Sequence, residues 1–392
     1  MPSLSSRVGA FTDSVIRRMT RINDSVPGSI NLSQGFPDWR PPPAVMDRLA
    51  QVAHEGPHQY STTWGAQNIR EAIADKYGPG VGRRVDPDSQ ICVTCGGTEA
   101  MMAAVMTVCD PGDRVIVFSP FYENYGADAL LSGARAVFVP LRPPSFTFDP
   151  GELERAFAAG ARAIIVCNPS NPTGRVLGRD ELATIADLAR RYDAFVITDE
   201  VYEHIVFDDN EHVTMASLPG MAGRTICCNS LSKTYSMTGW RLGFLIGPAE
   251  VIEGARKVHD FLTVGAAAPL QEAAVVGLRQ GPEYYAWLRD EYTRKRGILC
   301  AGLDAAALDY NRPQGTYFVM VDIARLLQDP RFAGMTDLDF CTWMIHEIGV
   351  AAVPGSSFFH DPVNNWVRLH FARADEVLAE AGRRLAGLAE YG

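Results

Sequence analysis

The sequence has 392 residues, enough for two or three domains with a large core, which excludes a small disulfide-stabilised scaffold. Hydrophobic residues make up 47% and charged residues 21%, as in ordinary globular proteins, which excludes a disordered or fibrous chain. The formal charge of -10 would repel phosphate backbones and anionic lipid, so we expect neither nucleic acid nor a membrane as a partner.

Three features of the chain predict a cytoplasmic protein. No apolar run reaches the length of about 18 residues that a membrane span needs. Residues 1–25 lack the continuous apolar core of a secretory signal. The eight cysteines lie mostly inside apolar segments, as buried thiols do in a reducing compartment.

Short β-branched runs alternate with longer amphipathic stretches over most of the chain. The predicted strands are 91–95, 115–118, 136–139, 163–167, 195–198, 225–228 and 242–246, and the predicted helices between them are 99–108, 152–158 and 179–191. This alternation is typical of βα units around a mostly parallel sheet with helices on both faces. The sequence therefore predicts an α/β fold, with a three-layer α/β/α domain around a seven-stranded sheet.

The pattern changes after about residue 290. The elements predicted there are a helix over 284–303, a strand over 317–322, a helix over 338–347, a short strand over 350–353 and a helix over 375–388. Together they indicate a smaller α+β unit. We expect a large domain over residues 46–289 and a small discontinuous domain formed by residues 1–45 and 290–392.

Cys92 and Cys95 form a C-x-x-C pattern, which suits a redox pair or half of a zinc site. No second C-x-x-C follows in the sequence, and residues 91–95 also have the composition of a buried strand. We favour the second interpretation, in which burial raises the thiol pKa values and makes both cysteines inert.

Polar residues and glycines follow several predicted strands at their carboxyl ends. Gly96-Gly97-Thr98-Glu99 opens a helix, where free backbone N–H groups suit a phosphate. Asn171 lies in a turn-rich segment after one strand, and Asp199 and Tyr202 follow the next. Taken singly, each is also compatible with a plain turn or a helix cap. Because an open α/β sheet binds its ligand at these strand ends, we expect the residues to converge.

The most informative segment runs from Ser230 to Arg241. It places Lys233 among hydroxyl and small side chains, with Arg241 eight positions later (241 minus 233). Lysine is the residue that forms Schiff bases with carbonyl compounds. A cofactor that carries both an aldehyde and a phosphate would use all of these parts.

Asn171-Pro172-Thr173-Gly174, Asp199-Glu200-Val201-Tyr202 and Ser230-Leu231-Ser232-Lys233 with Arg241 resemble, in order and spacing, the pyridoxal-phosphate-dependent class I/II aminotransferases of fold type I. Residues 31–38 are similar to the branch that includes kynurenine aminotransferase, glutamine transaminase and aspartate aminotransferase-like enzymes. The resemblance implies pyridoxal 5'-phosphate as cofactor and a homodimer. It also implies a ping-pong transfer of an amino group from an L-amino acid to a 2-oxo acid.

The same resemblance implies a role for each matched residue, and no metal ligands. Lys233 would bind the cofactor as a Schiff base and transfer the proton, Asp199 would pair with the pyridine nitrogen, and Tyr202 and Asn171 would bind the phenolic oxygen. The other implied cofactor contacts are Gly97, Thr98, Ser230, Ser232 and Arg241 at the phosphate, Tyr60 of the partner subunit at the same phosphate, and Tyr122 against the ring.

For the substrate, the resemblance implies that Arg368 binds the α-carboxylate, assisted by Asn171 and the backbone of Gly35. The aromatic residues expected around the substrate side chain are Trp39, Trp64, Phe121, Tyr125 and Phe358, which favours an apolar or aromatic substrate. Because of Arg40, a substrate with an acidic or amide side chain also remains open. Arg373 is expected past the end of the strand that carries Arg368, with a surface role.

Two other functions use the same residues. A lyase or cyclase would form the same carbanion at Cα and follow it with β- or γ-elimination, replacement or ring formation. A binding protein that keeps the fold without catalysis is the alternative from another class, and the intact Lys233, Asp199 and Arg241 argue against it.

Overall fold

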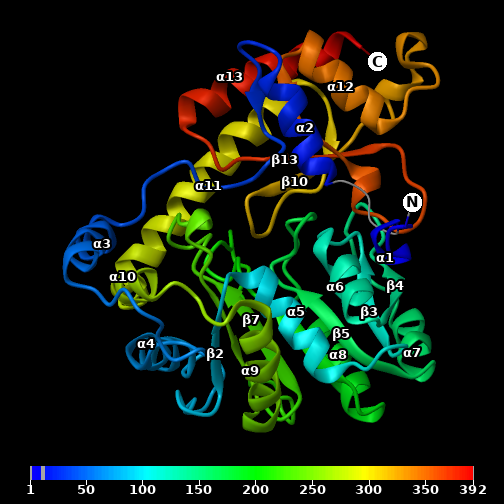
Figure 1. Ribbon diagram of the computed structural model, residues 1–392. Coiled ribbons are helices and arrows are strands. Elements are labelled where there is room, and N and C mark those ends of the chain that lie inside the picture. The colour runs from blue at the N-terminus through cyan, green and yellow to red at the C-terminus, as the bar shows by residue number, and fades with distance from the viewer. Residues whose placement is uncertain (1, 10–13, 392) are drawn as a thin grey trace.

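The computed structural model describes residues 2–9 and 14–391 (Figure 1). Its large sheet consists of β2 (Ile91–Thr94), β3 (Arg114–Ser119), β4 (Arg135–Pro140), β5 (Ala161–Cys167), β6 (Phe195–Asp199), β7 (Thr225–Ser230) and β8 (Gly243–Ile246). The strand order is β2-β8-β7-β6-β5-β3-β4, with β8 antiparallel to both neighbours and the other pairs parallel. All seven predicted strands are confirmed. The largest shifts of an end are at residue 161 instead of 163 and residue 230 instead of 228.

Helices cover both faces of this sheet, as the three-layer prediction requires (Figure 1). The helices on the large unit are α3 (Pro43–Glu55), α4 (Gln67–Tyr77), α5 (Gly97–Val108), α6 (Asn124–Ser132), α7 (Pro150–Ala158), α8 (Arg179–Arg191), α9 (Ala249–Thr263) and α10 (Ala268–Leu278). Because side chains alternate along a strand, Ile197 packs with α5 and α9, whereas Val196 packs with α7 and α8. This alternation also fixes the face to which each residue at a strand end belongs.

Five of these helices, namely α3, α4, α6, α9 and α10, were not located from the sequence. Helix α10 shows why: Ala268–Leu278 is almost entirely apolar, so it lacks the one-sided pattern that identifies an amphipathic helix. It packs between α3 and α4 and the sheet, and is therefore buried on several sides.

A second group of elements lies above the large sheet in Figure 1. It contains a four-stranded antiparallel sheet of order β12-β13-β10-β9, and β1 pairs with β11 in parallel. Its strands are β1 (Ile30–Asn31), β9 (Asp309–Tyr310), β10 (Phe318–Asp322), β11 (Val350–Ala351), β12 (Val353–Pro354) and β13 (Trp366–His370). Its helices are α2 (Val15–Asp24), α11 (Pro282–Ala305), α12 (Asp337–Glu347) and α13 (Asp375–Ala386), and α1 (Ser6–Gly9) lies nearer the large sheet.

One apolar core joins the N-terminal segment to the last hundred residues. Met19 and Leu32 are fully buried in it, together with Leu299 and Val350. The exact domain boundaries at residues 45 and 290 remain a prediction. Among the helices of the described residues, none is both long and apolar enough to cross a lipid bilayer.

Candidate active site

The predicted site residues lie at the carboxyl ends of three adjacent parallel strands. Asn171 follows β5, Asp199 ends β6 and Ser230 ends β7. Asp199 is two residues after Ile197, and Ser230 two residues after Cys228, so both side chains belong to the face covered by α5. Strand periodicity therefore brings together residues that are far apart in the sequence.

Asp199 is a buried carboxylate whose hydrogen-bond donors, among the described residues, are all uncharged. Its Oδ2 accepts a hydrogen bond from the Tyr125 hydroxyl at 2.7 Å and its Oδ1 accepts one from the Val201 N–H at 3.3 Å. Burial raises the pKa of Asp199, and the hydrogen bond from Tyr125 counteracts part of that increase. A cation placed next to this carboxylate would relieve the cost of burying it.

Tyr125 makes a contact that the sequence did not predict. It was expected around the substrate side chain, and α6 directs its hydroxyl to Asp199. Tyr125 and Asn171 do border one small cavity, of about 20 Å³. Neighbouring Tyr122 is half-buried, and its ring meets that of Tyr125 edge-on, with centroids 5.8 Å apart.

Arg368 is a buried guanidinium whose hydrogen-bond acceptors, in the part of the chain that the structure describes, are all uncharged. Its Nη1 donates to Asn171 Oδ1 at 2.8 Å and its Nη2 to the Ser33 carbonyl at 3.0 Å, while Nε has no partner. The rings of Phe318 and Phe358 lie on it, with centroids 4.2 and 4.5 Å from Cζ. Burial lowers the pKa of Arg368 to about 10. An anion would supply the charge that this site lacks.

The turn between β2 and α5 lies directly against Arg241. Gly96 has φ +87°, and a Cβ at this position would be 2.4 Å from Arg241 Nη2. A side chain here would therefore displace the guanidinium, so both its backbone angle and this contact favour glycine. A Cβ on Gly97 would be 3.5 Å from the Cβ of Ser230, which places the start of α5 beside the end of β7.

Two hydroxyls and a solvent-facing arginine surround this turn. The Ser232 N–H donates to Ser230 Oγ at 3.3 Å, and both serines are buried. The guanidinium of Arg241 is exposed and Nη1 donates to the Thr238 carbonyl at 2.9 Å. Thr98 is exposed on the first turn of α5. The predicted phosphate residues are therefore brought together.

Lys233 and Tyr202 both lie close to the ring of Tyr317. Lys233 is half-buried, and its Nζ lies 5.8 Å from the centroid of the Tyr317 ring. Tyr202 is buried with its ring edge-on to Tyr317, at 5.3 Å between centroids. The Tyr317 hydroxyl donates to the Gly35 carbonyl at 3.1 Å. Sequence reasoning did not identify Tyr317, because it stands more than 80 residues (317 minus 233 is 84) from the motif it joins.

Three further predicted residues contact other parts of the chain or solvent. Trp39 is half-buried and packs against Tyr292, with ring centroids 5.1 Å apart. Tyr60 is 89% exposed and contributes no side-chain contact to the group within this chain. Trp64 packs on Arg256 of α9, with 4.8 Å from the guanidinium to the ring centroid.

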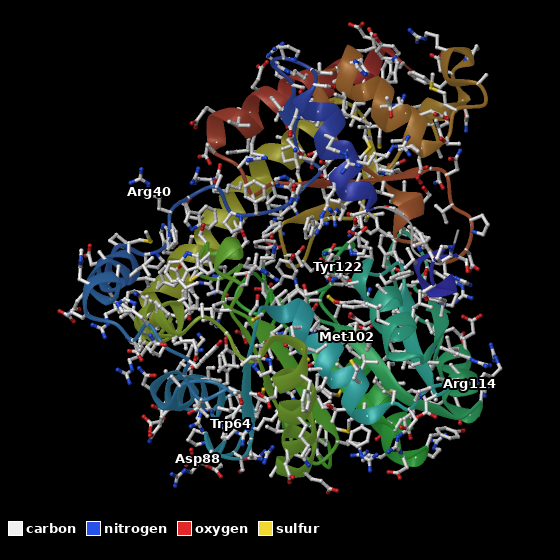
Figure 2. All side chains as sticks on the ribbon, in the orientation of Figure 1. Arg40, Trp64, Asp88, Met102, Arg114 and Tyr122 are labelled. Carbon is white, nitrogen blue, oxygen red and sulfur yellow. The ribbon has the colours of Figure 1, made fainter. Side chains whose placement is uncertain are left out.

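The structure corrects the expectations for two arginines. Arg40 is exposed, and Figure 2 shows it at the outer edge of the molecule, away from Tyr122, so it does not face the site. Arg373 lies past the end of β13, as expected, but the surface role is wrong. Its Nε donates to the Asn31 carbonyl at 3.2 Å, and its Cζ lies 5.0 Å from the centroid of the Phe36 ring. Arg373 therefore supports the Asn31–Phe36 segment.

The two cysteines of the C-x-x-C pattern have raised thiol pKa values, as we expected for buried side chains. Cys92 is buried in β2, and burial raises its pKa to about 12. Cys95 follows the strand, and burial also raises its pKa. All eight cysteines belong to the described residues and are free thiols.

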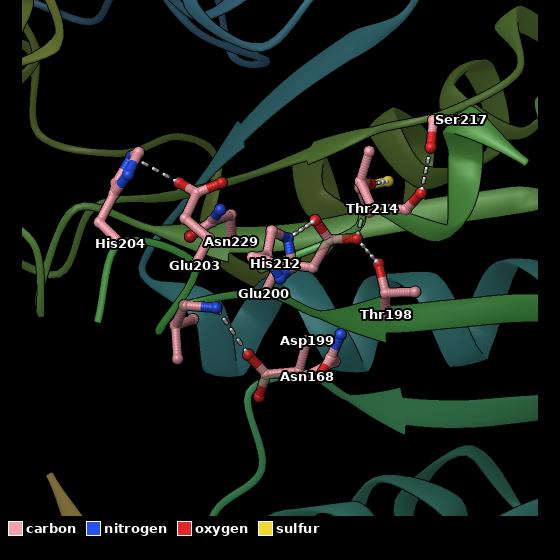
Figure 3. A network of polar contacts seen from close by, with 12 residues as sticks. Asn168, Thr198, Asp199, Glu200, Glu203, His204, His212, Thr214, Ser217 and Asn229 are labelled. Atoms are coloured by element: carbon pink, nitrogen blue, oxygen red, sulfur yellow. Dashed lines mark hydrogen bonds and ion pairs between the residues drawn. The ribbon is translucent and has the colours of Figure 1, made fainter. Parts of the chain in front are cut away.

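A polar network lies on the other face of the sheet, behind Asp199 (Figure 3). Glu200 Oε1 accepts hydrogen bonds from Thr198 at 2.7 Å and Thr214 at 2.9 Å, and Oε2 lies 3.0 Å from His212 Nε2. Glu200, Glu203 and His212 offer metal-ligating atoms within 4.8 Å of one another. Both oxygens of Glu200 are already hydrogen-bonded, whereas Glu203 Oε1 and His212 Nδ1 are buried without a hydrogen-bond partner among the described residues.

Comparison with known proteins identifies the family. The model of the family described as "Aminotransferase class I and II" matches residues 27–385. The methionine aminotransferase of Escherichia coli is 38% identical over 92% of this chain and 92% of its own length. A probable N-succinyldiaminopimelate aminotransferase of Mycobacterium tuberculosis is 38% identical over 98% of both chains.

Solved structures agree with this result. A crystal structure from Escherichia coli, whose title identifies a methionine aminotransferase function, has a TM-score of 0.92 at 36% identity and covers 99% of this chain and 100% of its own. That of the Mycobacterium tuberculosis N-succinyldiaminopimelate aminotransferase has a TM-score of 0.91 at 38% identity, with coverage of 99% and 100%. These relatives are named for amino transfer, which supports transfer rather than the lyase alternative. This chain therefore belongs to the class I and II aminotransferases and is an aminotransferase with the fold of that family.

Proposed function

We propose that this enzyme binds pyridoxal 5'-phosphate and, as a homodimer, transfers the amino group of an apolar or aromatic L-amino acid to a 2-oxo acid. One observation carries the proposal: Asp199 and Arg368 are both buried, and among the described residues neither forms an ion pair. Buried charges are normally paired, so two unpaired ones of opposite sign in one site indicate a ligand that supplies both counter-charges.

The residues present fit the cofactor at three points. The Asp199 carboxylate suits a protonated pyridine nitrogen. The turn at Gly96, the N-terminus of α5, the two serines and Arg241 offer donors to a phosphate. Lys233 directly follows Ser232 in the chain and is half-buried. When bound, pyridoxal phosphate supplies an aldehyde that condenses with amines and a ring that accepts the electron pair left on Cα.

The side chains of the protein would do the remaining work. Arg368 would bind the substrate carboxylate through its two outer nitrogens, because a guanidinium matches a carboxylate in geometry. Asn171 Oδ1 already accepts from Arg368, so its amide N–H groups are free to donate to a cofactor oxygen. Lys233 Nζ would take the proton from the substrate Cα and deliver a proton to the C4′ carbon of the cofactor.

The preference for an uncharged substrate side chain rests on the rings around Arg368. Phe318 and Phe358 cover its guanidinium, and Tyr122 borders the same region. Arg40, the residue that left an acidic substrate open, is on the outer surface. One relative is named for methionine, whose side chain would suit such surroundings.

A first half-reaction tests the activity. The holoenzyme is mixed with a panel of L-amino acids and no 2-oxo acid, and products are identified by mass. We expect one 2-oxo acid per active site, conversion of the cofactor to its amine form, and the fastest reaction with an apolar or aromatic amino acid. Lys233→Ala should give no product in the same assay. Continuous release of ammonia with many turnovers would instead establish a lyase.

The homodimer rests on an exposed apolar patch formed by Phe261, Leu262 and Val264 at the end of α9, with Tyr60 nearby in the chain segment bound to α9. Phe261 is 92% exposed. The segment is bound because His259 Nε2 lies 2.9 Å from the Thr63 carbonyl. A second copy of the chain would cover these side chains and bring Tyr60 to its phosphate.

Mixed dimers test this assembly. Tyr60→Ala and Lys233→Ala subunits are each defective when alone. If Tyr60 acts across the interface, mixing and re-equilibrating them restores activity, because one site in the hybrid then has both residues. Hybrids that stay as inactive as the parent proteins would contradict the proposal. So would a protein that is monomeric in light scattering and still active in the amino-transfer assay.

A further inference from the structure

A buried histidine lies behind the turn that faces Arg241. His259 of α9 has 0% exposure. Its Nδ1 lies 2.8 Å from Glu99 Oε1, and its Nε2 lies 2.9 Å from the Thr63 carbonyl oxygen. An ionised carboxylate and a backbone carbonyl only accept hydrogen bonds. Both contacts are satisfied only if both ring nitrogens carry a proton, which is the positively charged form.

Glu99 meets donors with both of its oxygens. Besides His259, Oε1 accepts from the Thr263 hydroxyl at 2.7 Å, and Oε2 accepts from the Cys95 backbone N–H at 2.5 Å. This last bond spans the turn at Gly96 and Gly97, and Gly96 lies against the guanidinium of Arg241. The carboxylate therefore connects the turn to α9.

The charges around His259 favour its protonated form. The ionisable groups that face it are Glu99 from α5, Asp260 from α9 and the Cys95 thiol beside Glu99, while the Thr63 segment contributes only a carbonyl. Burial disfavours the charge, but the hydrogen bond and charge of Glu99 outweigh burial and raise the pKa of His259. Burial raises the pKa of Glu99, and its three donors outweigh that effect and lower it.

We propose that Glu99 and a doubly protonated His259 are a positioning ion pair that holds the phosphate turn (Cys95 to Thr98) against the Thr63 segment, and thereby sets the affinity for the cofactor phosphate. This inference rests on the proposed cofactor. Neither residue touches the cofactor: Glu99 acts through the backbone of the turn, and His259 acts through Glu99 and through the segment that carries Tyr60 three positions earlier (63 minus 60).

The protonation state is tested on the unsubstituted holoenzyme. Protein labelled with ¹⁵N-histidine is examined by NMR at pH 7.5, and the His259 signals are assigned by their loss in His259→Gln. We expect both ring nitrogens to have the shift of protonated nitrogens. A neutral ring, with one nitrogen protonated and the other not, would overturn the proposal.

The effect on the cofactor is tested by titrating the cofactor-free enzyme with pyridoxal phosphate. We expect the Kd to rise about tenfold in Glu99→Gln and in His259→Gln, because a charged buried hydrogen bond is lost. His54→Gln makes the same change on the exposed face of α3 and should stay within about twofold of wild type. The ratio of the His259→Gln and wild-type Kd values should approach one as the pH rises and the wild-type histidine becomes neutral.

A purely structural role would lower stability in the variants but leave that ratio independent of pH, which would overturn the proposal. If either variant does not fold, Thr263→Val removes one donor to Glu99 and should raise the Kd by a smaller factor. An unchanged Kd in Thr263→Val would overturn it as well. Failure of the wild type to bind pyridoxal phosphate at all would instead refute the proposed function.

Discussion

Arg368 and Arg296 are two buried arginines that differ in the charge of their partners. Arg368 is 1% exposed and Arg296 2% exposed. Arg296 donates to both oxygens of Asp208, at 2.7 and 2.8 Å, and to the Pro313 carbonyl. Arg368 donates only to an amide oxygen and a carbonyl oxygen. The charge of Arg296 is therefore neutralised within the chain, whereas Arg368 has no ion-pair partner among the described residues.

Two adjacent carboxylates show the same contrast. Glu200 faces His212 and two threonine hydroxyls, while Asp199, on the other face of the strand, has only uncharged donors (Figure 3). The difference teaches that burial alone does not mark a functional charge. What distinguishes the site is a buried charge whose counter-charge is missing.

The largest effect that separates the two arginines should come from Arg368→Gln. We expect kcat/KM for the amino acid to fall about 10³-fold, corresponding to about 4 kcal/mol for losing one partner of a buried charge pair. Without substrate, the free energy of unfolding should stay equal or rise by about 1 kcal/mol, because an unpaired buried charge is removed. Steady-state kinetics and urea unfolding measure the two quantities. A variant that loses stability and keeps its kcat/KM would place Arg368 with Arg296 instead.

Tyr125→Phe tests whether Asp199 depends on its uncharged donor. The hydroxyl lowers the pKa of Asp199, so its loss should move the acid side of the pH profile of kcat towards higher pH. We expect kcat to fall about tenfold, the value of one hydrogen bond to a charged group. Tyr192→Phe, which removes a hydroxyl bonded to surface residue Glu154, should leave the profile unchanged. Equal profiles for both variants would show that Asp199 does not need Tyr125.

Asp208→Asn should affect stability and leave catalysis intact. Arg296 lowers the pKa of Asp208, so the pair stabilises the fold above the unfolded pKa of about 4 and loses this contribution as the pH falls through the lower folded pKa. Because the Asp208 side chain is half exposed, we expect a loss of only about 1 kcal/mol at pH 7, shrinking in acid. Urea unfolding at several pH values tests this expectation. A tenfold fall in kcat/KM would mean that the pair also serves the site.

The sequence predicted those parts of the site that lie in contiguous motifs. Asn171, Asp199 and Lys233 each come at or after the end of a short, buried β-branched run, so their convergence could be expected from topology. Tyr125 and the rings over Arg368 belong to other elements, and the Tyr125–Asp199 contact spans 74 residues. No local pattern encodes which hydroxyl reaches a given carboxylate.

The errors have a similar origin. Arg373 was correctly placed past the strand end, but its partner, the Asn31 carbonyl, is 342 residues away. Arg40 is exposed at the outer edge of the molecule, although it directly follows Trp39 in the sequence. In the fold, the seven strands are short β-branched runs that end in turn-forming residues and were found, whereas the nearly uniform apolar helix α10 gave no periodic signal.

The smallest expected effect concerns His212, the partner of the structural carboxylate Glu200. Burial opposes its protonation, but the hydrogen bond and charge of Glu200 outweigh burial and raise the pKa of His212. The pair therefore stabilises the fold fully below the unfolded pKa of about 6.5 and loses this contribution as the pH rises through the folded pKa. His212→Gln should remove this pH dependence, worth about 1 kcal/mol or less, with kcat unchanged at pH 7. Urea unfolding of both proteins at pH 6 and pH 9 gives the difference.

If the unfolding free energy of the wild type changes as little with pH as that of the variant, Glu200 is held by Thr198 and Thr214 alone. A fall in kcat would instead mean that the charge behind the strand reaches Asp199, so that the two carboxylates are not independent.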